Sequence, residues 1–221
     1  MKSLRTISRR AHRASGFSLL EMAMVMAILI MMGSITFMSL QPVLKQNRVN
    51  NAYNTSLAAF RQARDNAIAQ RTSYVVTFND TANPPTVTVA PTFSGFQGVL
   101  PSATYPLPPN VKFSNEAGIP TSSSYTPDGF GTGAKAVDFG YTPTGGTGGQ
   151  KSVYFCPDGS AQDAAGGAGQ CMGNFSSGVL YIARPGELMS SRALTVWGAT
   201  GRIRGWRLYD NGSGGTAWKR Q

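Results

Sequence analysis

The sequence predicts an α+β protein in which one long N-terminal helix packs on a mainly antiparallel β-sheet body. Three observations lead to this prediction. Residues 17–40 form an apolar run, apolar residues continue at helical spacing to about Gln70, and from residue 72 onward short β-branched and aromatic segments alternate with turns rich in Gly and Pro. With 221 residues, 41% of them hydrophobic, the chain is large enough to bury a core of one or two domains.

Residues 1–16 form a basic leader. This segment contains five cations and no acid, so it supplies half of the formal net charge of +10. It also contains His12, the single histidine of the chain. The body therefore has no imidazole, which excludes Ser-His-Asp and Cys-His catalysis and His-ligated metal sites there. We expect no catalytic activity, cofactor or metal; an anchored extracytoplasmic enzyme is the weakest alternative, because no paired acids stand out.

The apolar run is apolar or small throughout except for Glu21. At about 1.5 Å per residue it can cross a hydrocarbon core of about 30 Å, and we expect a membrane-spanning helix over residues 17–41. The preceding cations predict a cytoplasmic N-terminus and an extracytoplasmic body. The alternative is a cleaved secretory signal peptide, but its apolar stretch would be shorter and would end at a small-x-small site, which is not evident at residues 34–42.

Glu21 is unusual, because a carboxylate inside a spanning segment costs about 2.5–3.5 kcal/mol and usually has a partner. The residues Gly16-Phe17-Ser18-Leu19-Leu20-Glu21 resemble the class III leader junction of type IV pilins and pseudopilins. The resemblance implies that prepilin peptidase cuts after Gly16 and methylates Phe17, so that Glu21 becomes the fifth residue of the mature chain. In a packed array, the new amino group of one subunit would neutralise Glu21 of its neighbour and set the stagger between helices.

Residues 42–71 are predicted to continue the helix as an amphipathic half. Five apolar residues recur there mostly at spacings of three and four: Val49, Tyr53, Leu57, Phe60 and Ile68. We expect this stripe to pack on the body. Pro42 predicts a kink or local melting, because proline removes a backbone donor and clashes with the preceding turn.

Residues 72–221 are predicted to form the β body. Seven segments have strand character: 74–78, 86–89, 136–139, 152–155, 179–182, 193–197 and 202–209. Connections rich in Pro or Gly join them, notably residues 91–110 and 142–150.

Cys156 and Cys171 are the only cysteines. In an extracytoplasmic body they should form a disulfide, and a closed loop of about 15 residues is worth about 3 kcal/mol in the chain-entropy model. A metal site built on two cysteines without histidine is the disfavoured alternative.

The C-terminal segment carries the one basic cluster that the sequence shows after the leader. Residues 198–221 contain five cations against the single acid Asp210, namely Arg202, Arg204, Arg207, Lys219 and Arg220. On an extended strand Arg202, Arg204 and Trp206 share one face and Ile203 the other, an arrangement that suits phosphate contacts and base stacking. In the alternative, the arginines pair with acids of the body or with a neighbouring subunit.

This C-terminal segment, residues 152–160 and the long N-terminal helix together resemble the GspH/FimT group of minor pilins and pseudopilins. The resemblance implies a pilin-like fold, storage in the bacterial inner membrane with a periplasmic body, and assembly with other minor pilins and the inner-membrane platform into a type II secretion pseudopilus or a type IV pilus. Some members bind DNA during natural transformation through a Gly-Arg-x-Arg motif, which residues 201–204 reproduce. The sequence leaves open which machine is served and whether DNA is bound.

Overall fold

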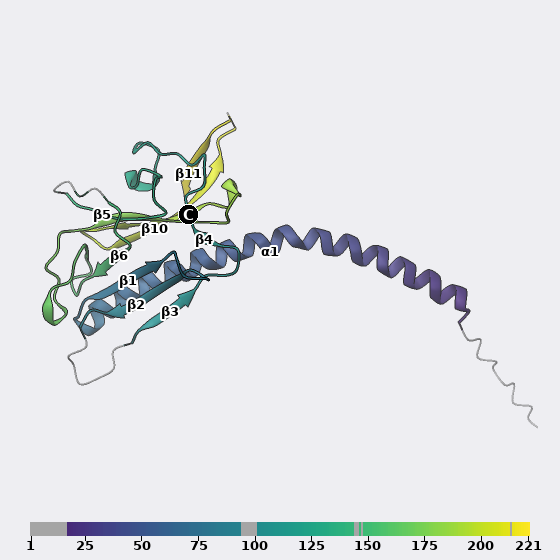
Figure 1. Cartoon of the computed structure of the whole chain (residues 1–221), viewed down its shortest axis with the longest axis horizontal. Helices are drawn as coiled ribbons and strands as arrows, with labels where there is room; N and C mark the ends of the chain where they lie inside the picture. Colours follow the sequence, from purple (N-terminus) through teal and green to yellow (C-terminus); the bar gives the residue numbers. More distant parts are fainter. Residues whose placement is uncertain (1–16, 94–100, 144–145, 147, 213) are drawn as a thin grey trace, which may run out of the picture. The chain divides into compact units, whose positions relative to one another are not determined.

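The computed structural model describes residues 17–93, 101–143, 146, 148–212 and 214–221; the predicted leader and Gly16 lie outside these residues. The chain forms two compact units, Met1–Leu44 and Lys45–Gln221. Helix α1 (Leu19–Gln70) contributes residues to both units. With two antiparallel sheets following this helix, the predicted α+β class is confirmed (Figure 1).

The described residues of the second unit form two β-sheets in which every strand pairing is antiparallel. The first sheet has the strand order β3-β2-β1-β6-β7, with bounds Ala103–Pro106, Thr86–Pro91, Tyr74–Asn79, Ser152–Phe155 and Ala161–Gln162. The second has the order β11-β10-β9-β8-β4, with bounds Thr216–Arg220, Arg202–Asp210, Arg192–Trp197, Ser177–Ala183 and Lys112–Phe113. Strand β5 (Val137–Tyr141) also pairs with β8.

The main core lies between the second half of α1 and both sheets. Phe60 of the helix is fully buried, and its ring centroid lies 5.5, 5.9 and 6.2 Å from those of Phe78, Phe139 and Phe155. These partners come from β1, β5 and β6, so a single side chain joins the helix to both sheets. Aromatic pairs at such separations stabilise the fold beyond the apolar area that they bury.

The helix contacts the sheets through a stripe that differs in part from the predicted one. Val49, Tyr53 and Phe60 are buried and Leu57 is partly buried, as expected, but Ile68 is 43% exposed. Small residues occupy most of the contact stripe: Ala52, Ser56, Ala59, Ala63 and Ala67. Small side chains allow the helix backbone to approach the sheets closely, and Ile68, one position after Ala67, points away from that contact.

The sequence predicted a kink or local melting at Pro42. Helix α1 continues through Pro42 without a break, so local melting, one of these two alternatives, is wrong. Proline lacks one N–H and removes one hydrogen bond, but the residues on both sides of it keep their helical conformation.

All seven predicted strands are present, as β1, β2, β5, β6, β8, β9 and β10. The described residues contain four more. Strand β3 lies inside the segment 91–110, which was expected to be a connection. Strands β4 and β7 have only two residues each. Strand β11 ends in Lys219 and Arg220, which interrupt the alternation of apolar and polar residues that would have indicated a strand. Strands β8 and β9 are buried on both faces, because a second apolar cluster around Tyr181 and Leu208 covers the outer face of their sheet.

The predicted disulfide is confirmed. Cys156 and Cys171 are bonded with a Cα–Cα distance of 5.9 Å, and 15 positions separate them in the sequence. Gly159, inside the closed loop, accepts a hydrogen bond of 3.2 Å from Arg64 Nε of α1. The disulfide loop is therefore attached directly to the helix.

Candidate functional site: the apolar helix and the basic cleft

The first half of α1 is long and apolar enough to cross a membrane. Its large hydrophobic side chains are exposed from Leu19 to Leu44, whereas the helix residues after Val49 that face the sheets are buried. An apolar surface of this extent is covered by lipid or by another protein in an aqueous cell, because a soluble monomer does not leave it in water. The chain therefore carries an apolar segment for which the described residues supply no cover.

The structure places Phe17 and Glu21 at the start of this segment. Phe17 precedes the helix and is 78% exposed, and Glu21 lies in the first turn of α1. A carboxylate in the first turn is favoured by the partial positive charge of the free backbone N–H groups. Among the described residues no cation forms an ion pair with Glu21.

The C-terminal cations divide between the two faces of the sheet. Arg202, Arg204 and Trp206 share one face of β10, as predicted. Arg207 lies on the other face of β10, where Lys219 of β11 is its cross-strand neighbour. The charged groups of Arg207 and Lys219 lie 5.2 and 5.1 Å from the ring centroid of Tyr209. The five predicted residues therefore do not form one surface.

Arg204 is engaged inside the protein. Its guanidinium forms an ion pair with Asp128, whose side chain is 4% exposed, and lies 5.5 Å from the ring centroid of Trp197. Thr195 Oγ1 donates to Asp128 over 2.5 Å and accepts from Trp206 Nε1 over 3.1 Å. Arg202 is exposed, whereas Arg204 and Trp206 both belong to an internal polar network. For Arg204 this agrees with the alternative in which the arginines pair with acids of the body.

A cleft of about 410 Å³ lies between the helix, the start of β10 and the end of β11. We call it the basic cleft; its lining residues are Tyr53, Leu57, Arg61, Ile203, Arg204, Gly205, Arg220 and Gln221. It brings Arg204 and Arg220 together with Arg61, whereas Arg202, Arg207 and Lys219 are not among its lining residues. Sequence reasoning missed Arg61, although its position four residues after Leu57 and eight after Tyr53 places all three on one side of the helix.

Arg192 is a second cation that the sequence did not single out. It is 2% exposed on β9, and its guanidinium donates to Ser190 O, Ser191 O and Asn50 Oδ1 at 3.1–3.2 Å. Burial, together with the nearby charge of Arg207, lowers its pKa to about 10. Its bond to Asn50 ties β9 to α1, which is a structural role.

Gly201, the first residue of the Gly-Arg-x-Arg motif, is required by the fold. It has a φ of +57°, and a Cβ built there would lie 2.0 Å from Gly159 O and 3.0 Å from Arg64 Nε. Gly159 belongs to the disulfide loop, so the turn before β10 packs directly on that loop. Two of the four motif positions, Gly201 and Arg204, therefore have structural partners.

We expect Gly201→Ala to lower the free energy of unfolding by more than the roughly 1–2 kcal/mol that a left-handed conformation costs an L-residue. The added Cβ would also overlap a backbone oxygen, which cannot move aside as a flexible side chain can. Gly212→Ala is the matched control, because Gly212 has a φ of +77° and no atom within 4 Å of the added Cβ. Denaturant unfolding gives the free energy of unfolding of each variant, and the difference between the two losses measures the contact between Gly201 and Gly159. Equal losses in the two variants would contradict this contact.

No family model, no curated protein and no solved structure matches this chain.

Proposed function

We propose that this chain is a minor pilin or pseudopilin, a membrane-anchored subunit that starts or caps a type IV pilus or a type II secretion pseudopilus. One observation carries the proposal: a continuous helix whose second half completes the core of the body, while its first half leaves its apolar side chains exposed. Such a segment suits storage in lipid before assembly and packing against other helices afterwards.

Glu21 supports a filament subunit over a simple anchor. An anchor gains nothing from a carboxylate that raises the cost of insertion, whereas a helix in an array can use it to fix register against a positive chain end. Cleavage before Phe17, by the prepilin peptidase, would create such an end four residues before Glu21 in every subunit. The prediction for Gly16 and Phe17 rests on the leader resemblance.

Replacing Glu21 with valine tests this proposal. We expect filament incorporation in the native cell to be lost, while the variant inserts into the membrane at least as well as the wild type, because the costly charge is gone. Met24→Val in the same apolar segment is the control and should assemble. The measurements are the subunit content of sheared filaments, the amount in the membrane fraction, and the mature N-terminus by mass spectrometry.

Two results would overturn the proposal. Normal assembly of Glu21→Val would remove the role of the charge in register. A mature N-terminus at any residue other than Phe17 would remove the leader resemblance on which the filament class depends.

The basic cleft favours a second candidate, in which the same subunit binds DNA at the filament tip. Its arginines at positions 61, 204 and 220 come from two distant parts of the chain and border one cleft. Arg61 and Arg220 are exposed and are free of ion pairs within the described residues, so they are available to phosphates.

We expect Arg61→Gln/Arg220→Gln to weaken DNA binding by the detergent-solubilised full chain and to reduce the salt dependence of log K by about 2, since each lost phosphate contact removes about 0.9. Lys112→Gln/Lys135→Gln removes the same charge from exposed positions elsewhere and is the control. Electrophoretic binding at several salt concentrations measures both. Equal slopes for the two double variants would exclude a DNA site at the cleft.

A further inference from the structure

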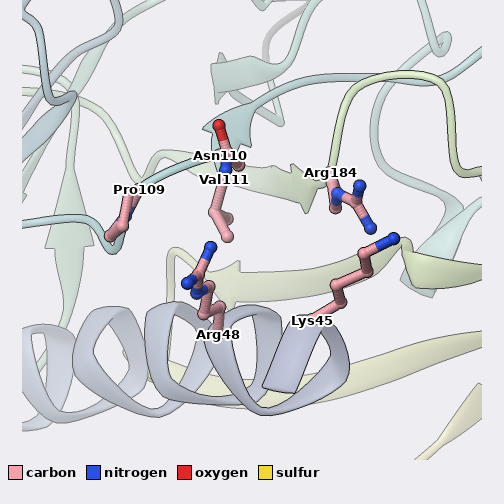
Figure 2. A pocket seen from close by; sticks show the side chains of 6 residues that line it. All are labelled: Lys45, Arg48, Pro109, Asn110, Val111 and Arg184. Atoms are coloured by element: carbon pink, nitrogen blue, oxygen red, sulfur yellow. The ribbon is translucent and has the colours of Figure 1, made fainter. Parts of the chain in front are cut away.

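A small pocket at the start of the second unit is lined by three cations. Lys45 and Arg48 come from α1, Arg184 follows β8, and Pro109, Asn110 and Val111 complete the lining. Figure 2 shows the end of Arg48 directed toward Val111, and the ends of Lys45 and Arg184 directed toward each other. We call this group the juxtamembrane pocket.

The charges of the juxtamembrane pocket are largely uncompensated. Within the described residues, Lys45 and Arg48 form no ion pair and no side-chain hydrogen bond, and Arg184 is paired with Glu187 over 2.6 Å. Glu187 is 46% exposed, so this pair is open to solvent and is weakly held. Three cations that line one small pocket and share one exposed carboxylate repel each other, and an additional anion would relieve that repulsion.

The size of the pocket indicates which anion it could accept. Its volume of about 50 Å³ corresponds to roughly three to five water-sized sites. A phosphate group with its four oxygens is of this size, whereas a nucleotide or a folded partner is not. Arginine suits such a group, because its planar guanidinium donates two parallel hydrogen bonds to phosphate oxygens.

The position in the chain indicates the source of the phosphate. Leu19 to Leu40 rises about 33 Å in a helix, the thickness of a hydrocarbon core, and Lys45 follows Leu40 by a rise of about 7.5 Å. The headgroup layer on each side of the core is of similar thickness. If the proposed membrane storage is correct, Lys45 and Arg48 lie at the depth of lipid phosphates on the extracytoplasmic side.

From this we propose that the juxtamembrane pocket binds the phosphate of an anionic phospholipid while the subunit is held in the membrane. The inference rests on the proposed function, because it requires α1 to be in a bilayer. A lipid phosphate bound by Lys45, Arg48 and Arg184 links the part of α1 at the start of the second unit to the segment after β8. It also gives the stored subunit a contact that must be released when the subunit leaves the membrane.

The test uses the full chain extracted in mild detergent and mixed with phosphatidylglycerol or phosphatidylcholine, with retained lipid counted by native mass spectrometry. We expect the wild type to retain phosphatidylglycerol, and Lys45→Gln, Arg48→Gln and Arg184→Gln each to reduce retention about fivefold. Arg71→Gln/Lys135→Gln/Lys219→Gln, which removes three exposed cations that line neither this pocket nor the basic cleft, is the control and should retain lipid as the wild type does.

A variant with the opposite effect guards against misfolding. Glu187→Gln releases Arg184 from its ion pair and is expected to increase retention of phosphatidylglycerol, a gain that a damaged fold would not give. Inorganic phosphate is added as a competitor to the wild type. Displacement of the lipid by phosphate at equal concentration would show a site for free phosphate and overturn the lipid assignment.

The remaining outcomes separate this proposal from the proposed function. Resistance of the chain to carbonate extraction from vesicles reports membrane insertion independently of the pocket. A chain that inserts but retains both lipids equally, or whose pocket variants behave as the control does, overturns lipid binding alone and leaves an acidic segment of a neighbouring subunit as the occupant to test. A chain that does not insert overturns both.

Discussion

Phe60→Ala is expected to lower the free energy of unfolding by about 3–5 kcal/mol, the usual range for removing a buried aromatic ring. The side chain is fully buried and contacts rings from β1, β5 and β6, strands that belong to different sheets. Because the backbone around it is fixed by the helix and two sheets, the cavity left behind cannot collapse fully. Both the lost transfer free energy and the cavity then contribute to the cost.

Urea unfolding of the full chain in detergent, followed by tryptophan fluorescence, measures this effect. Tyr125→Ala is the control, since Tyr125 is 71% exposed and its removal should change stability by less than about 0.5 kcal/mol. A loss below about 1 kcal/mol for Phe60→Ala would contradict the central position of this side chain in the core.

Removing the disulfide by Cys156→Ala/Cys171→Ala is expected to cost about 3 kcal/mol, the chain-entropy value for a loop of about 15 residues. The closed loop also carries Gly159, which accepts a hydrogen bond from Arg64 and supports the turn at Gly201. Loss of the bond therefore affects the helix contact and the start of β10 as well as the loop.

Unfolding of the double variant and of the wild type with and without reductant measures the contribution of the disulfide. The reduced wild type should match the double variant, since both lack the cross-link and keep similar side chains. If reductant leaves the stability of the wild type unchanged, the bond contributes nothing and the prediction is wrong.

The sequence was sufficient to predict the elements whose signal is local. The apolar run and the helical spacing from Val49 to Phe60 identified α1, and alternation of β-branched and aromatic residues identified seven strands. Strands of two residues, such as β4 and β7, have no period to detect, and they form because a longer neighbour offers free backbone groups. The prediction placed Ile68 in the contact stripe because it ranked residues by hydrophobicity. The buried positions are instead alanines, whose small side chains let the helix backbone approach the sheets closely.

The candidate site could be predicted only in part, because its partners are far apart in the sequence. Arg204 pairs with Asp128, 76 positions away, in the turn Pro127–Gly129. Arg61 reaches the basic cleft from the helix, and Arg184 meets Lys45 and Arg48 across more than a hundred residues. Such meetings depend on strand order, which one sequence does not specify. The sequence shows the charge of each residue, but it does not show which residues lie beside it in space.

The contact between Gly201 and Gly159 bears on how the tetrapeptide Gly-Arg-x-Arg should be used in surveys of genomes. In this chain its glycine packs the turn before β10 against the disulfide loop, and its last arginine forms an ion pair with the buried carboxylate of Asp128. In this chain the motif therefore stabilises the scaffold, and its presence alone does not indicate a ligand. Ligand preference has to be sought instead in the residues that border the cleft, such as Arg61 and Arg220.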